Sequence, residues 1–143
     1  MQLSKNALLT LAKAGQVSAG TAVEGDALDM QGWDGVLFFG TIAAFNAGNF
    51  IKAQQSSDAG VADAYADLEG SKVAATVNGQ VVGVDVYRPR ERYVRAYIVR
   101  AGANTATGDL YAVRYSGRKA PADNVTAGVL VLASLVSPAE GTA

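Results

Sequence analysis

The chain has 143 residues, of which 50% are hydrophobic and 17% charged, and its net charge is −1. This length suits one domain with a real core, because a chain of this size buries roughly 70% of its unfolded surface. Cysteine and histidine are both absent. Their absence excludes disulfide scaffolds, thiol chemistry, zinc sites built on these residues and histidine-based catalytic triads.

The charges are unevenly distributed along the chain. Residues 1–71 carry three basic and eight acidic side chains, whereas residues 72–119 carry nine basic and three acidic ones. Such asymmetry suits either a nucleic-acid face or complementary protein surfaces. The sequence pI near 5.3 favours protein, since dedicated nucleic-acid domains are usually basic.

Residues 1–15 are predicted to form a short helix or an extended arm. Ser4 is a suitable N-cap and Gly15 a suitable end, with an apolar stripe between them. The apolar groups here are too short for a signal-peptide core, and no run in the chain reaches the ~20 residues of a membrane-spanning helix. We therefore expect synthesis in the cytoplasm and no membrane partner.

Turns and strands alternate through the middle of the chain. Turn residues around Trp33 precede the run VLFFGTIAAF at residues 36–45, which is apolar on both faces and predicts a central strand. Gly40 inside this run predicts a bulge or a close backbone approach. Another strand is predicted over residues 50–55, and a short helix or ordered loop linking two sheets over the acidic residues 57–69.

The clearest strand signals lie in residues 72–100. Residues 72–77 alternate, and Asn78-Gly79 is a strong hairpin-turn dipeptide. Residues 81–100 predict a β-hairpin with its corner at Pro89, which cannot donate to a sheet ladder. On the second arm, residues 94, 96 and 98 suit a core. The opposite stripe of Tyr93, Arg95 and Tyr97 suits either a partner contact or an ordinary solvated sheet face.

The end of the chain completes an all-β pattern. Strands are predicted over residues 109–116 and 126–136, with a flexible tail at residues 139–143. Short strands separated by turn signals favour an antiparallel β-sandwich over residues 16–138, jelly-roll-like in connectivity, with an open barrel as the alternative.

No catalytic or metal-binding pattern emerges from the polar residues. The acids of residues 57–69 lack the ligand spacing of a calcium-binding loop, and the chain has neither a glycine-rich phosphate loop nor a nucleophile elbow. The sequon at Asn124 is discounted, because such triplets are common and nothing indicates secretion. We therefore expect a protein that is not an enzyme and uses no cofactor or metal.

Three stretches resemble small proteins encoded among the head genes of tailed bacteriophages. They are SAGTAVEGDALDMQGWDGV at residues 18–36, KAQQSSD at residues 52–58 and VDVYRPRERYVRAYIVR at residues 84–100. These proteins look like capsid cement, or decoration, proteins. The resemblance implies a β-sandwich or jelly-roll subunit that sits as dimers or trimers outside an icosahedral shell and bridges its major capsid proteins.

The expected function is therefore that of a virion protein that stabilises the outer capsid surface. A small β-barrel binding nucleic acid or another head-tail component is the alternative. We expect a homo-oligomer, with a dimer favoured over a trimer. We also expect the basic stripe, chiefly Arg88, Arg90, Arg92 and Arg95, to contact protein carboxylates and not nucleic acid. The candidate contacts are Trp33, Phe38, Phe39, Arg88, Arg90, Arg92, Tyr93, Arg95 and Tyr97.

Overall fold

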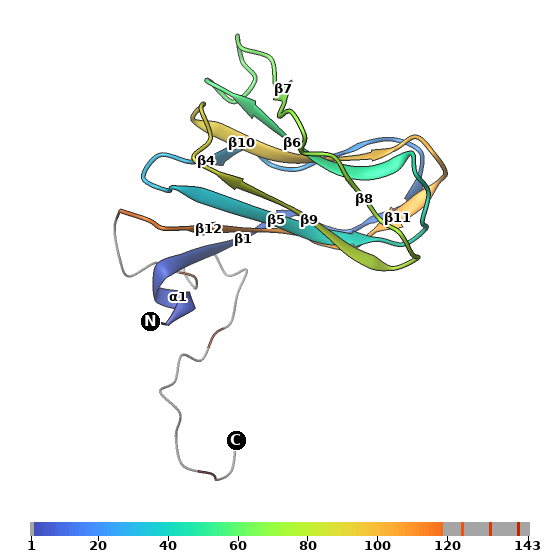
Figure 1. The fold of residues 1–143 in the computed structure, drawn as a ribbon, viewed down its shortest axis with the longest axis horizontal. Helices are drawn as coiled ribbons and strands as arrows, with labels where there is room; N and C mark the ends of the chain where they lie inside the picture. The colour runs from blue at the N-terminus through green and yellow to red at the C-terminus, as the bar shows by residue number, and fades with distance from the viewer. Residues whose placement is uncertain (1, 119–123, 125–131, 133–139, 141–143) are drawn as a thin grey trace.

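The computed structural model describes residues 2–118 together with residues 124, 132 and 140. Within this part, a short helix α1 (Leu3–Asn6) leads into two antiparallel β-sheets that pack face to face (Figure 1). The predicted all-β sandwich is confirmed. The predicted strand over residues 126–136 and the tail at 139–143 lie outside the described residues, apart from Leu132 and Glu140.

The first sheet is built around β5 (Gly35–Ile42). Strand β9 (Gln80–Tyr87) pairs with one side of β5, and β11 (Thr105–Thr107) and β12 (Leu110–Tyr115) pair with the other. Beyond them, β1 (Ala7–Lys13) pairs with β12, and β2 (Gln16–Ala19) pairs with β11. The apolar run at residues 36–45 therefore supplies the central strand, as predicted.

The second sheet is built around the long pair β6 (Asn49–Ser56) and β10 (Tyr93–Arg100). Strands β3 (Val23–Glu24) and β4 (Leu28–Asp29) pair with the far side of β10. Strands β7 (Ala66–Asp67) and β8 (Val73–Ala74) pair with the far side of β6. Residues 57–65, within the acidic stretch, thus form a loop within one sheet and not the predicted link between two sheets.

The strand order is that of a jelly roll. If β1/β2, β3/β4, β7/β8 and β11/β12 each count as one interrupted strand, both sheets contain four strands. Their order by chain position is first, eighth, third and sixth in one sheet, and second, seventh, fourth and fifth in the other. Consecutive strands therefore mostly cross between sheets, and this crossing is the origin of two wrong predictions.

The predicted hairpin over residues 81–100 is wrong. Strand β9 pairs with β5 and strand β10 pairs with β6, so the two arms lie in opposite sheets. The same holds for β8 and β9 on either side of Asn78-Gly79, where the N–H of Gly79 donates to the carbonyls of Ile42 and Ala43. Alternation indicates which face of a strand meets the core, but it does not identify the strand beside it.

The N-terminal helix is shorter than predicted. It ends at Asn6, and Ala7–Lys13 is a strand that pairs with β12. An isolated helix over residues 4–14 is marginal in water. Pairing with β12 instead satisfies the backbone and buries Ala7 and Ala12.

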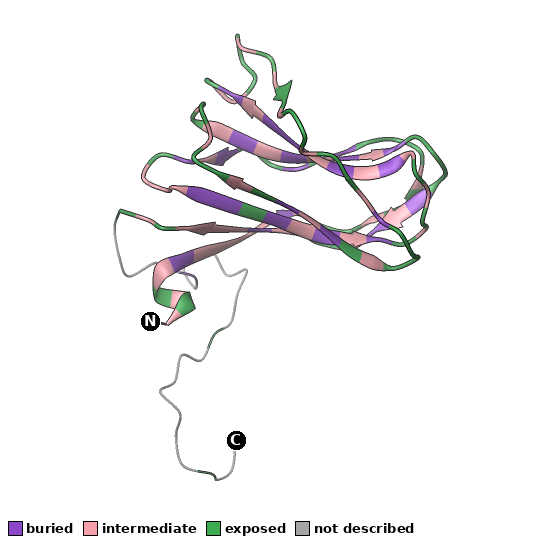
Figure 2. Cartoon of the chain, in the orientation of Figure 1, coloured by how far each residue is buried: buried purple, intermediate pink, exposed green. Residues whose placement is uncertain are grey.

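Buried hydrophobic residues from both sheets form one core between the sheets. Figure 2 marks the buried residues along the strands of both sheets in purple. The inward stripe of β10 is buried as predicted, with Val94, Ala96 and Ile98 at most 1% exposed. Gly40 marks a close backbone approach, since a Cβ there would lie 3.1 Å from the carbonyl oxygen of Asp109. The outward side chains then determine what each sheet presents to its surroundings.

Candidate interaction surfaces

The outer face of the second sheet carries charges that pair with each other. The guanidinium of Arg95, on β10, donates to Oε2 of Glu24 at 2.9 Å and to Oε1 of Gln54 at 2.9 Å. It also lies 4.0 Å from the centre of the Tyr65 ring. The neighbouring strands β3 and β6 place these partners, because cross-strand neighbours share a face. Arg95 is therefore engaged within its own subunit.

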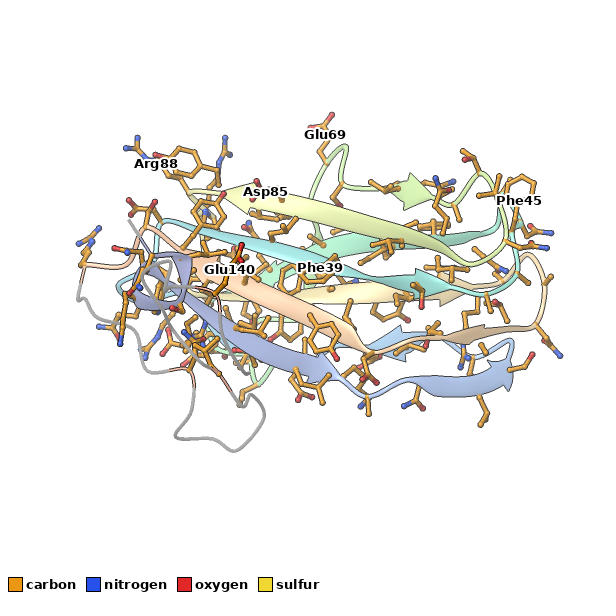
Figure 3. The ribbon with its side chains drawn as sticks, turned by 90° about the horizontal axis from the view of Figure 1, so that it is seen from below. Phe39, Phe45, Glu69, Asp85, Arg88 and Glu140 are labelled. Carbon is orange, nitrogen blue, oxygen red and sulfur yellow. The ribbon has the colours of Figure 1, made fainter. Side chains whose placement is uncertain are left out.

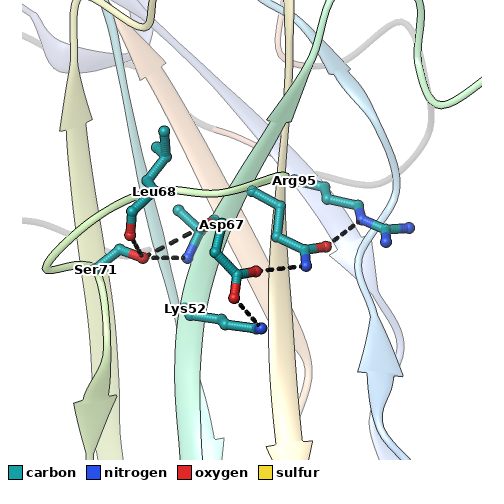
Figure 4. Close-up of polar contacts among 7 residues, drawn as sticks. Lys52, Asp67, Leu68, Ser71 and Arg95 are labelled. Atoms are coloured by element: carbon teal, nitrogen blue, oxygen red, sulfur yellow. Dashed lines mark hydrogen bonds and ion pairs between the residues drawn. The ribbon is translucent and has the colours of Figure 1, made fainter. Parts of the chain in front are cut away.

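Two further ion pairs extend this network. The amine of Lys52 donates to Oδ2 of Asp67 at 2.6 Å, and Gln54 donates to the other oxygen of Asp67 (Figure 4). Arg92 forms a two-pronged pair with Asp29 at 3.0 and 2.7 Å. Hydrogen bonds from Lys52 and from Arg92 lower the pKa of Asp67 and Asp29, respectively. We call this surface, with Glu24, Asp29, Lys52, Gln54, Asp67, Arg92, Tyr93, Arg95 and Tyr97, the ionic face.

The ionic face contains four of the candidate contact residues. Tyr93 and Tyr97 flank Arg95 on β10, and their rings lie 5.2 Å from the guanidinium of Arg92 and 5.5 Å from that of Arg95. These contacts favour the alternative interpretation of the stripe as a solvated sheet face. A partner at Arg92, Tyr93, Arg95 or Tyr97 stays a prediction.

The outer face of the first sheet is apolar. Strand register places Leu9, Val113 and Leu37 in one row across β1, β12 and β5, and Leu11, Tyr111 and Phe39 in the next. Leu37 is 37% exposed, and Val81 on β9 is 60% exposed. Figure 3 looks onto this face, with Phe39 near its middle. We call it the outer apolar face; it comprises Leu9, Leu11, Leu37, Phe39, Val81, Tyr111 and Val113.

One end of this face is held by a tyrosine that crosses a glycine. A Cβ on Gly35 would overlap the ring of Tyr115, so the glycine makes room for that ring to reach from β12 across β5. The hydroxyl of Tyr115 donates to Oδ1 of Asp85, on β9, at 2.6 Å. Burial and this hydrogen bond raise the pKa of Tyr115 to about 12. The hydroxyl therefore keeps its proton near neutral pH and ties three strands together.

At its β1 edge, the outer apolar face continues into a pocket. Its volume is about 290 Å³, and its apolar lining is formed by Leu3, Ala7, Leu9, Val113 and Leu132. Asn124 closes the pocket, accepting from the N–H of Leu9 at 2.7 Å and donating to the carbonyls of Ser4 and Ala7. This side chain is buried and fully used, which agrees with discounting the sequon.

The apolar candidate residues separate in the structure. Phe38 is 0% exposed and belongs to the core, so its prediction as a partner contact is corrected: it faces inward because β5 alternates. Trp33 is half-buried and packs against the core at one end of the sandwich. Phe39 alone of the three opens onto the outer apolar face, with its ring 5.8 Å from that of Tyr111.

The other candidate arginines lie at the end of the sandwich near Trp33. Arg88 and Arg90, together with Arg92 and Arg118, line a groove of about 740 Å³ between the turn at residues 30–34 and the loop at residues 88–92. We call it the basic groove. Sequence reasoning missed Arg118, and it missed Leu9, Leu11, Val81, Tyr111 and Val113 on the outer apolar face. Only long-range strand pairing brings these residues together.

Comparison with known proteins does not assign the chain to a family. No protein-family model matches the chain, and a search among curated proteins finds no similar one. In the described part of the chain, no group of three or more acidic side chains is placed to hold a metal ion. Among the same residues, no helix is long and apolar enough to cross a bilayer. The class that the fold defines is an antiparallel β-sandwich with jelly-roll connectivity.

Proposed function

We propose that this chain is a non-enzymatic virion protein that binds the outside of a tailed-bacteriophage shell and bridges its major capsid proteins. The resemblance of residues 18–36, 52–58 and 84–100 to cement proteins supports this function. The single observation that carries it is the outer apolar face, which spans β1, β12, β5 and β9.

The physical argument rests on the contrast between the two outer faces. The ionic face already pairs Lys52 with Asp67, Arg92 with Asp29 and Arg95 with Glu24, which suits a surface in water. The outer apolar face gains by being covered, since burying apolar surface contributes roughly 25 cal/mol per Å² before the entropic cost of association. Contiguous exposed apolar patches commonly mark protein contacts. Many such contacts repeated over a lattice add avidity to a modest single contact.

Co-sedimentation with purified, expanded shells that lack the protein tests this proposal. The wild-type protein should sediment with the shells in a saturable manner and raise their resistance to heat. Leu37→Lys should reduce this binding, because it places a charge in the middle of the outer apolar face. The variant should still fold, since Leu37 faces Asp85 across the strand pair and an opposite charge is tolerated there.

Val61→Lys is the matched control, because Val61 lies in the loop at residues 57–65 and is 87% exposed. This variant should bind shells as the wild type does. Failure of the wild-type protein to bind, or equal binding by all three proteins, would contradict the proposed contact. The alternative function, nucleic-acid binding, would use the arginines of the basic groove. The titration of that groove described below includes single-stranded DNA and tests this alternative.

A further inference from the structure

The chain has seven arginines. The side chains of four of them are bound to carboxylates or backbone carbonyls of the same subunit, and those of the other three are not. Arg92 and Arg95 are paired with Asp29 and Glu24. Arg100 and Arg114 donate to backbone carbonyls, Arg100 to Val17, Thr21 and Thr105, and Arg114 to Asp29. The other three have no ion pair or side-chain hydrogen bond with any described residue, and all three line the basic groove. They are Arg88, Arg90 and Arg118.

Backbone hydrogen bonds hold the three segments of the groove together. The N–H of Arg88 donates to the carbonyl of Asp34 at 2.7 Å, and that of Arg118 donates to Gly32 at 2.9 Å. The N–H of Met30 donates to the carbonyl of Arg92 at 2.8 Å. The loop at residues 88–92 and the segment around Arg118 are therefore both attached to the turn at residues 30–34. Because these bonds fix the backbone of the loops, less loop ordering is required when a ligand binds.

The backbone is also strained on both sides of the groove. Arg88 has φ of +53° and Ser116 has φ of +52°, a region that side chains other than glycine adopt at a cost of about 1 to 3 kcal/mol. In the described chain only one other non-glycine residue, Ala59, shares this conformation. Strain that the surrounding structure maintains is concentrated at functional sites. This strain occurs next to three arginines that have no carboxylate partner among the described residues, and the combination points to a ligand for the groove.

We propose that the basic groove binds a segment of another protein that carries several carboxylates. Guanidinium groups form strong two-pronged hydrogen bonds with carboxylates, and exposed partners of this kind give specificity and fast association. Asp34 and Glu91 also line the groove. These two acids interrupt the row of cations, so the groove lacks the continuous positive surface that suits a phosphate backbone. The groove deepens the proposed function by adding a second contact, away from the outer apolar face.

A fluorescence-anisotropy titration with a labelled oligoglutamate peptide tests the groove without any shell. The test variant is Arg88→Gln, Arg90→Gln and Arg118→Gln together. The control is Lys5→Gln, Lys13→Gln and Lys72→Gln, which removes the same three charges elsewhere. At ~0.15 M salt, where charges beyond ~8 Å are screened, we expect the groove variant to bind about tenfold more weakly than the wild type, and the control to bind as the wild type does.

Several results would overturn the inference. They are no peptide binding by the wild type, an equal loss in both variants, or tighter binding of single-stranded DNA that only the groove variant loses. The last result would assign the groove to nucleic acid. If the triple variant fails to fold, Arg90→Gln replaces it, because Arg90 is exposed and its side chain forms no ion pair or hydrogen bond with any described residue. The peptide assay contains no shells, so the two proposals can fail separately. A negative co-sedimentation result would refute the capsid proposal, and peptide binding at the groove would still support the inference made here.

Discussion

At the scale of single residues, Arg100 is the clearest case of a charge used for structure. Its side chain is 4% exposed and donates at 2.5 Å to the carbonyl of Thr21 and at 2.8 Å to those of Val17 and Thr105. These bonds join the segments at residues 17–21 and 101–105. Strand alternation predicts that residue 100 faces inward. The sequence does not show, however, that its guanidinium donates to backbone carbonyls and has no carboxylate partner there.

Replacing Arg100 with Met should therefore destabilise the fold. The variant keeps the length of the side chain but leaves buried carbonyl groups without donors, at a cost of about 3 kcal/mol in the free energy of unfolding. Urea unfolding followed by tryptophan fluorescence measures this loss. Arg90→Met is the control, because an exposed arginine outside such a network should change stability by no more than about 0.5 kcal/mol. Equal stabilities of the two variants would contradict the assigned role of Arg100.

At the scale of elements, the sequence predicts faces better than partners. Alternation correctly places Val82 and Val84 on the core side of β9, and Val94, Ala96 and Ile98 on the core side of β10. It fails to predict that these strands lie in opposite sheets, because jelly-roll pairing joins strands that are far apart in sequence. The outer apolar face is hidden from sequence reasoning for the same reason. Its rows form only when β1, β12, β5 and β9 are placed side by side.

The attachment of Asn124 to β1 gives a prediction at this scale. Asn124→Ala removes a hydrogen-bond partner from the N–H of Leu9 and from the carbonyls of Ser4 and Ala7. We expect a loss of about 1 to 3 kcal/mol in the free energy of unfolding and faster hydrogen exchange at Leu9. Exchange in β5 and β9 should change less. Asn104→Ala, at an exposed position, should leave exchange at Leu9 as it is; the same increase in both variants would contradict the attachment.

At the scale of the whole molecule, folding brings the acidic and basic parts of the sequence together. Glu24 and Asp29 come from the acidic first half, and their partners Arg95 and Arg92 come from the basic second half. The charge complementarity expected between subunits is thus partly satisfied inside one subunit. Among the described residues, the surfaces left without a partner are the outer apolar face on one sheet and the basic groove at one end.

This arrangement leads to the last prediction: subunits that are not bound to a shell associate through the outer apolar face, and the shell then competes with the second copy for that face. A two-fold contact is the commonest solution for homo-oligomers, and it would cover Leu37, Phe39 and Tyr111 of both copies at once. Light scattering at low micromolar concentration should give a mass near twice the 14.7 kDa of one chain. Phe39→Asp should give the monomer mass, because a carboxylate buried in such a contact has no partner there.

Val61→Asp is the control and should remain dimeric, and Leu37→Lys repeats the test should Phe39→Asp fail to fold. A wild-type mass of 14.7 kDa under these conditions would contradict self-association. The shell would then be the one proposed partner of the outer apolar face.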